Sequence, residues 1–268
     1  MRITSTHNPR VKALADLKER KGREREGKFL IEEAREIERA AEAGIRLETV
    51  IISDSLNDNE ARVYADLARV GRLEVLEVSQ GPMKRLSSRE NPAGLIAVAR
   101  IPERSLSAFK PPIDALILLA VGLEKPGNLG AVLRSADAAG ASAVLVAGGV
   151  DLYSPQVIRN STGVIFSLPT FGASESEILA WLRQHRISLI ATTPHTDTLF
   201  WQADLRGPVA IAVGPEHEGL SEGWLEAATT RVCIPMRGQA DSLNVSVTAA
   251  LLLYEARRQR TNMDRNTP

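Results

Sequence analysis

Three loops in the C-terminal half of the sequence combine glycines with polar side chains that can hold a small ligand. The first, residues 121–130, has Gly127, Asn128 and Gly130 where a helical pattern begins. Backbone N–H groups at a helix N-terminus bind anionic or polar groups, so this is a candidate ligand-binding loop. It lacks the Lys and Ser/Thr of a P-loop and the GxGxxG spacing. The alternative is a plain strand-to-helix turn with Asn128 as the N-cap.

Arg134 lies in the helix that follows this loop. Four apolar residues predict the buried stripe of that helix: Leu129, Val132, Leu133 and Ala136. Arg134 falls off the stripe, so a solvated arginine is the default expectation. Only its closeness to the loop suggests a chemical role.

The second loop, residues 212–224, follows a buried-looking strand and contains Gly214, Glu216 and Gly219. A glycine at a strand end lets a ligand approach the backbone closely, and Glu216 adds a carboxylate. The alternative is a turn that caps the helix beginning at Ser221. His217 is expected to be structural or exposed, because none of the four histidines has metal-ligand spacing.

The third loop, residues 233–244, contains the polar stretch RGQ and then Ser242, Leu243 and Asn244. Asn244 also begins an Asn-X-Ser sequon, which is accidental in a chain that is not secreted. The following helix is apolar nearly all round between residues 245 and 253, so it must be buried on more than one side. Pairing with a second subunit would supply the second side, which predicts a homodimer.

The elements around these loops predict the fold class. Short apolar strands alternate with helices from residue 115 onward, which favours a mostly parallel sheet covered on both faces. Ligands bind at the carboxyl ends of the strands in such α/β sheets, where all three loops lie. Residues 1–100 form a smaller α/β unit, and the proline-rich residues 101–112 separate it as a linker from a domain spanning residues 113–268.

Composition narrows the functional class. The chain has 268 residues, 44% hydrophobic, and a single cysteine, Cys233, which excludes an intramolecular disulfide and a Cys-rich zinc site. No metal is therefore expected. Neither a signal-like N-terminus nor a membrane-length apolar run is present, so we expect a cytoplasmic protein without membrane contact. Residues 1–28 carry nine Lys/Arg against four Asp/Glu, which fits either contact with RNA phosphates or a solvated helix face.

Three motifs in this order resemble a known family. PGNLGAVLRSADAAGA, IAVGPEHEGLS and CIPMRGQADSLNVSVTAALLLYEA are similar to the ordered motifs of the SpoU branch of the SPOUT methyltransferases, over residues 115–258. The resemblance implies an RNA ribose 2′-O-methyltransferase that uses S-adenosyl-L-methionine. It also implies an α/β domain with a C-terminal trefoil knot, which the general rule against threaded chains would not have predicted.

The resemblance assigns roles to five side chains in the motifs. Asn128 matches the asparagine of the first motif and Arg134 its catalytic arginine. Glu216 matches the glutamate of the second motif, and Ser242 and Asn244 belong to the third.

The resemblance also assigns the cofactor contacts. The backbone groups of Gly214, Ile234 and Leu243 match the positions that hold the adenine and methionine parts of the cofactor. Two features depart from the family pattern: Glu124 and Lys125 replace an aspartate before the Pro-Gly-Asn, and Pro215 stands where a polar residue is common. These departures affect the expected loop shape rather than the matched residues.

The N-terminal domain, residues 1–100, is similar to the small substrate-binding domain of these enzymes, which has a ribosomal-protein-like RNA-binding fold. The expected substrate is ribosomal RNA, with transfer RNA as the alternative. A non-catalytic RNA-binding protein of the same fold is a second alternative, and a Rossmann-type dinucleotide enzyme a third. The sequence lacks the glycine fingerprint and the downstream acidic residue that a Rossmann-type enzyme requires.

Overall fold

The computed structural model describes residues 2–71, 73–215 and 218–264, which form two compact units. The first unit comprises Met1–Glu103 and Asp151–Ser167, and the second comprises Arg104–Val150 and Leu168–Pro268. The cut after Glu103 falls within the linker expected at residues 101–112. The segment Asp151–Ser167 lies within the expected second domain, residues 113–268, but it packs in the first unit.

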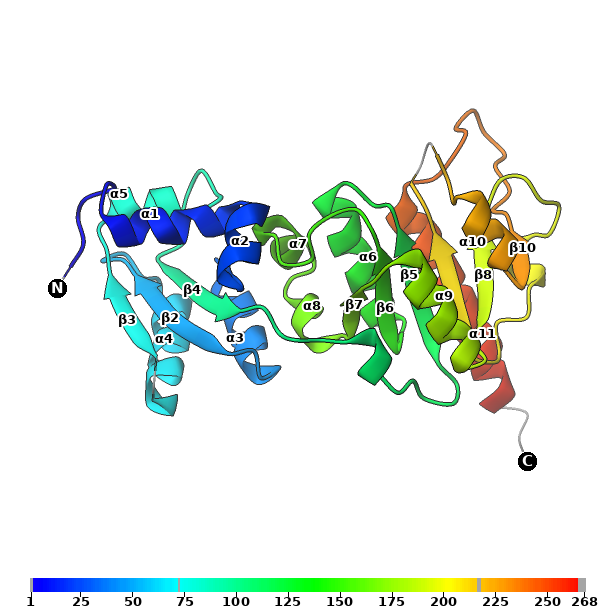
Figure 1. The fold of residues 1–268 in the computed structure, drawn as a ribbon, viewed down its shortest axis with the longest axis horizontal. Coiled ribbons are helices and arrows are strands. Elements are labelled where there is room, and N and C mark those ends of the chain that lie inside the picture. Colours follow the sequence, from blue (N-terminus) through cyan, green and yellow to red (C-terminus); the bar gives the residue numbers. More distant parts are fainter. Residues whose placement is uncertain (1, 72, 216–217, 265–268) are drawn as a thin grey trace. The chain divides into compact units, whose positions relative to one another are not determined.

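The first unit has a four-stranded mixed sheet in the order β1-β4-β2-β3 (Figure 1). Its strands are β1 (Lys28–Ile31), β2 (Leu47–Ile52), β3 (Glu74–Glu77) and β4 (Leu95–Arg100). Its helices are α1 (Pro9–Ala15), α2 (Arg20–Glu26), α3 (Ala34–Glu42), α4 (Asp58–Val70), α5 (Gln80–Leu86), α7 (Pro155–Asn160) and α8 (Val164–Ser167), with a 3-10 turn, η1 (Asp16–Lys18). Apolar side chains of α1 and α5, among them Val11 and Met83, pack against Leu30, Ile51 and Ile96 of the sheet.

The second unit has a six-stranded sheet in the order β10-β8-β9-β5-β6-β7, and every neighbouring pair is parallel. Its strands are β5 (Leu116–Val121), β6 (Ala143–Ala147), β7 (Thr170–Gly172), β8 (Ser188–Thr192), β9 (Val209–Val213) and β10 (Thr230–Val232). The central strands are almost continuous runs of buried apolar residues, because both faces of the sheet are covered. The predicted fold class, an α/β domain with a parallel sheet, is confirmed.

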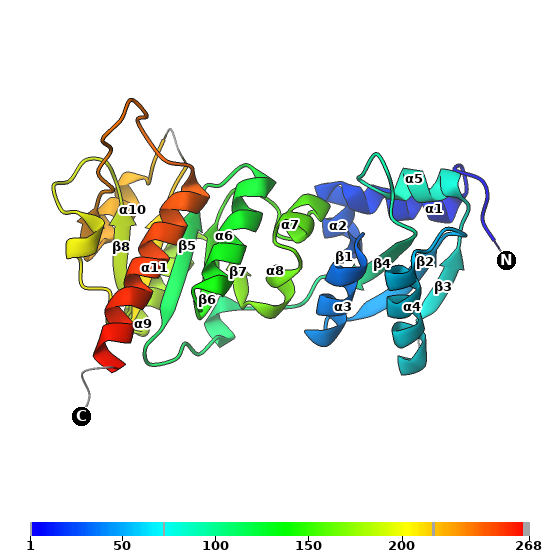
Figure 2. The ribbon, with the colours of Figure 1, turned by 180° about the vertical axis from the view of Figure 1, so that it is seen from behind.

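Helices cover both faces of this sheet. Its longer helices are α6 (Pro126–Ala138), α9 (Glu175–Gln184), α10 (Glu222–Ala227) and α11 (Val245–Asp264), with two 3-10 turns, η2 (Leu106–Ala108) and η3 (Phe200–Gln202). Figure 2 shows α6 and α11 side by side against the sheet. On the other face, Trp181 of α9 and Trp224 of α10 pack into the apolar core. None of the helices among the described residues is long and apolar enough to cross a membrane.

The apolar run VIFSLP, residues 164–169, begins with the short helix α8 (Val164–Ser167) and not with a strand. Thr162 and Gly163 have φ angles of 53° and 81°, so the chain turns sharply there. The N–H of Phe166 then donates to the carbonyl of Gly163, which closes a helical turn. A short apolar run has no periodicity that separates a strand from a buried helical turn.

Candidate active site

The loops at the carboxyl ends of β5, β8, β9 and β10 surround two neighbouring cavities in the second unit. The larger has a volume of about 540 Å³, a size suited to a small-molecule cofactor. The smaller measures about 140 Å³ and is lined by the loop after β5 and by Asn128. Both are bordered by Pro215, Glu218 and Val245, so they form adjoining parts of one site.

The three residues expected to hold the cofactor, Gly214, Ile234 and Leu243, all line the larger cavity. Within the described part of the chain, their backbone N–H and C=O groups form no hydrogen bonds. Unpaired backbone groups beside a cavity are available to a polar ligand. At Gly214, a Cβ atom would lie 2.6 Å from the carbonyl oxygen of Gly219, so the loop itself requires glycine at this position.

Asn128 and Asn244 come together although they are 116 residues apart in sequence. The side-chain Nδ2 of Asn244 donates to Oδ1 of Asn128 at 3.2 Å. The Oδ1 of Asn244 accepts the backbone N–H of Ser246 at 3.0 Å, so Asn244 caps α11. The alternative in which Asn128 caps its own helix is wrong, because Lys125 occupies that position and Asn128 lies in the first turn of α6. The positive ends of two helices thus meet at this amide pair, and their dipoles favour a negative group.

The remaining expected residues are placed differently. Ser242 is exposed and lines the larger cavity. Glu216 lies outside the described residues, as does His217. Glu218, a carboxylate that the sequence reasoning did not select, is exposed and borders both cavities.

Arg134 is exposed on α6 and lines neither cavity. Its side chain forms no hydrogen bond or ion pair with any residue that the structure describes. It follows Asn128 by six positions, which corresponds to about 9 Å along the helix axis. The structure therefore leaves this guanidinium outside the larger cavity, and its five N–H donors are not engaged by described residues.

The loop after β8 contributes to the site and was missed by the sequence reasoning. Thr192, Thr193, Pro194 and His195 line the larger cavity. The hydroxyl of Thr193 accepts the backbone N–H of His195 at 3.2 Å, which shapes the turn. The rule that ligands bind at strand ends could have identified this loop, but the sequence does not reveal that β8 pairs with β9.

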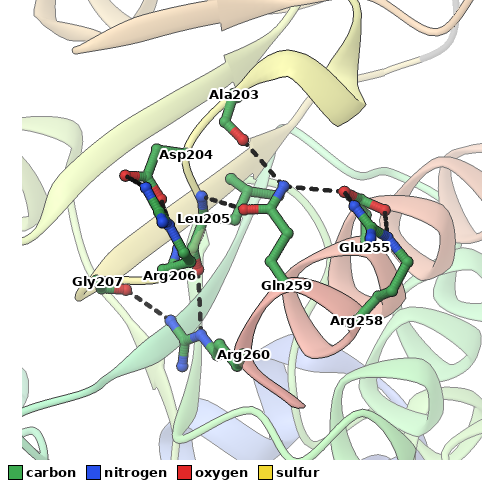
Figure 3. A network of polar contacts seen from close by, with 9 residues as sticks. All are labelled: Ala203, Asp204, Leu205, Arg206, Gly207, Glu255, Arg258, Gln259 and Arg260. Carbon is green, nitrogen blue, oxygen red and sulfur yellow. Dashed lines mark hydrogen bonds and ion pairs between the residues drawn. The ribbon is translucent and has the colours of Figure 1, made fainter. Parts of the chain in front are cut away.

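A polar network fixes the far end of α11 (Figure 3). The side chain of Gln259 donates to the carbonyl of Ala203 at 3.0 Å and accepts the N–H of Leu205 at 2.9 Å. Arg260 donates to four main-chain carbonyls, those of Asp114, Ala115, Leu205 and Gly207. Burial lowers the pKa of the Arg260 guanidinium. The network thus ties the helix that begins beside Asn244 to the starts of β5 and β9.

Among the residues that the structure describes, no three His, Cys, Asp or Glu side chains gather in a way that could hold a metal ion. The polar groups around the two cavities are instead main-chain amides, hydroxyls, the side-chain amide of Asn128, the carboxylates of Glu124, Glu218 and Asp241, the Lys125 ammonium and the His195 imidazole. This set can orient a polar organic ligand and stabilise a developing charge.

Comparison with known proteins identifies the family. The SpoU rRNA Methylase family matches residues 115–254, and the MRM3-like substrate binding domain matches residues 8–97. The chain is 35% identical to the 23S rRNA (uridine(2479)-2′-O)-methyltransferase of Streptomyces viridochromogenes, over 97% of this chain and 92% of the relative.

Solved structures agree with this match. One, described as an RNA 2′-O ribose methyltransferase, is 69% identical, with a TM-score of 0.86 over 97% of this chain and all of the other. A second, the SpoU methyltransferase AviRb of Streptomyces viridochromogenes in complex with AdoMet, is 33% identical, with a TM-score of 0.88 over 95% of this chain and 99% of the other. The predicted family and the predicted class of enzyme, a methyltransferase, are confirmed: the chain belongs to the SpoU rRNA Methylase family.

Proposed function

We propose that this enzyme transfers a methyl group from S-adenosyl-L-methionine to the 2′-hydroxyl of a ribose in ribosomal RNA. The observation that carries the proposal is the meeting of the loops after β5, β9 and β10 around adjoining cavities of about 540 and 140 Å³. Relatives named as 23S rRNA 2′-O-methyltransferases align over nearly the whole chain, which supports ribosomal RNA as the substrate.

The larger cavity suits the cofactor in size and chemistry. Free backbone groups at Gly214, Ile234 and Leu243 can pair with the adenine edge and the methionine moiety, while the side chains of Leu220 and Leu243 offer apolar contact. S-adenosylmethionine supplies an activated methyl group on a sulfonium. Two solved relatives contain this cofactor, which supports the same assignment here.

The chemistry requires alignment and charge stabilisation more than a strong base. Methyl transfer is an in-line displacement, so the ribose hydroxyl must be held against the methyl group while it loses its proton. A guanidinium group is a poor general base. We assign Arg134 to orienting the hydroxyl and stabilising the developing alkoxide, with a neighbouring RNA phosphate receiving the proton.

The amide pair supports this step from the smaller cavity, which Asn128 lines. Asn128 and Asn244 are joined by a hydrogen bond where α6 and α11 begin, so their helix dipoles add positive potential near the reacting oxygen. Ser242 lines the larger cavity and contributes a hydroxyl. Glu216, the matched glutamate of the second motif, is proposed on the family pattern alone.

The first unit is proposed to bind the RNA. It matches a substrate-binding domain, and residues 1–28 carry an excess of five positive charges. Sequence-specific RNA recognition usually targets unpaired loops, in which a single ribose is accessible. A trefoil knot in the second unit and a cytoplasmic location are further inferences from the family.

A homodimer is proposed from the exposed face of α11. Val247, Leu251 and Tyr254 are 46%, 39% and 53% exposed and share one stripe of the helix. The opposite stripe, which includes Ala249 and Leu252, is fully buried in the second unit. A second copy would cover the exposed stripe and bring arginines of one subunit to the site of the other. Sedimentation analysis should show a dimer for wild type and a monomer for Leu251→Glu, and a fully active wild-type monomer would contradict this.

Labelled methyl transfer tests the proposed activity. Ribosomal and transfer RNA from a strain lacking the gene are incubated with the enzyme and methyl-labelled cofactor, and the labelled ribose is mapped. We expect one 2′-O-methyl group in ribosomal RNA. If only transfer RNA is labelled, the substrate is transfer RNA and not ribosomal RNA. No label together with no cofactor binding by calorimetry would identify a non-catalytic RNA-binding protein.

A further inference from the structure

The segment Asp151–Ser167, called the strap below, lies between β6 and β7 in sequence but packs in the first unit. The ring of Phe29 in β1 lies 5.0 Å from that of Tyr153 and 5.9 Å from that of Phe166. All three side chains are buried, so the strap is part of the core of that unit. Both flanks of the strap, however, are strands of the second unit's sheet.

A buried ion pair holds the beginning of the strap. Arg23 of α2 is 3% exposed, and its Nη2 lies 2.6 Å from Oδ2 of Asp151. The same guanidinium donates through Nη1 to the carbonyls of Leu17 and Lys18 at 2.8 and 2.6 Å, which fixes its orientation. The other carboxylate oxygen of Asp151 accepts the N–H of Tyr153 at 2.9 Å. Asp151 is therefore held rigidly in the first unit.

The residues just before the strap are fixed to the active site. The N–H of Val150 donates to the carbonyl of Leu123 at 2.9 Å. Gly149 lies so close to Leu123 that a Cβ atom would be 2.3 Å from its carbonyl oxygen, and its φ of 80° also favours glycine. Leu123 lines the smaller cavity together with Asn128. Val150, which is hydrogen-bonded to Leu123 of the active-site loop, is thus joined to Asp151 by a single peptide bond.

We propose that Arg23 and Asp151 are positioning residues for methyl transfer, which rests on the function proposed above. Adjacent Cα atoms are about 3.8 Å apart across a planar peptide bond, so a fixed Asp151 restricts where Val150 can lie. Val150 in turn restricts the loop of residues 122–125 beside Asn128. RNA held by the first unit can thereby set the conformation of the catalytic loop through the chain junction at 150–151.

The competing explanation is that the ion pair only stabilises the first unit. Removing one partner of a buried pair leaves an uncompensated charge, so any substitution of Arg23 also destabilises its surroundings. Asp151→Asn keeps an oxygen that can accept the N–H of Tyr153, but it also leaves the buried Arg23 guanidinium without a compensating charge. A separate variant must alter the junction and leave the pair intact.

The decisive variant inserts two glycines between Val150 and Asp151 in the full chain. The insertion preserves both the Arg23–Asp151 ion pair and the hydrogen bond from Val150 to Leu123. It lengthens the chain between them, so the position of Asp151 no longer restricts that of Val150. Arg20→Ala is the matched control, since Arg20 lies on the same helix and pairs with Glu24 at an exposed position.

Two measurements separate the explanations. Hydrogen exchange of the Gly122 and Asn128 amides reports on the loop without RNA, and single-turnover methylation at saturating RNA and cofactor reports on alignment. For the insertion and for Asp151→Asn we expect faster exchange and about a tenfold slower turnover, a typical coupling between sites, with unchanged cofactor affinity. Wild-type exchange and turnover in the insertion variant would overturn the proposal, whatever Asp151→Asn does. If wild type methylates no RNA, the proposed function fails, and the exchange measurement still tests the junction.

Discussion

Replacing Arg134 with lysine separates the role of positive charge from that of a planar, multidentate donor. Arg134 is exposed, its side chain forms no hydrogen bond or ion pair with described residues, and lysine has a similar helix propensity. The free energy of unfolding should therefore change by less than about 0.5 kcal/mol. Because Arg134 lines neither cavity, the affinity for S-adenosylmethionine should not change.

The rate of the chemical step should change much more. Loss of one preorganised donor to a developing oxyanion typically costs about 2.7 kcal/mol, so Arg134→Lys should slow single-turnover methyl transfer roughly a hundredfold. Arg183→Lys is the matched control, because Arg183 is also exposed on a helix of the same unit and has no described partner. Thermal unfolding, calorimetric cofactor binding and labelled methyl transfer measure the three quantities. Near-normal methylation by Arg134→Lys would refute the assigned role.

Three further substitutions test other parts of the structure. Burial raises the pKa of Glu36, so the free energy of unfolding falls as pH rises from the ordinary carboxyl pKa through the raised value. Glu36→Gln should therefore raise the free energy of unfolding at neutral pH but not at acidic pH. Glu42→Gln, at an exposed position, is the control and should not raise it. Gly214→Ala should weaken cofactor binding in calorimetry, because its Cβ would strike the Gly219 backbone, whereas Gly207→Ala meets open space and should bind normally. Arg260→Met removes donors to four carbonyls and should lower the free energy of unfolding in urea by about 2 kcal/mol; an unchanged midpoint would contradict this anchoring role.

The sequence by itself determined the parallel α/β architecture and the family. Buried parallel strands are continuous apolar runs, and such runs are visible without knowing their partners. The family resemblance assigns Gly214, Ile234 and Leu243 to the cofactor, and all three line one cavity at the strand ends, where the strand-end rule places a ligand. Local signals of this kind depend only on neighbouring residues.

Only the tertiary structure decided how distant segments meet. The hydrogen bond between Asn244 and Asn128 spans 116 residues, and the bond from Arg23 to Asp151 spans 128. The membership of the strap in the first unit and the place of the β8 loop in the site were likewise not visible in the sequence. The physical reason is that burial and pairing of these groups depend on strand order and packing, which local propensity and hydrophobic period do not encode.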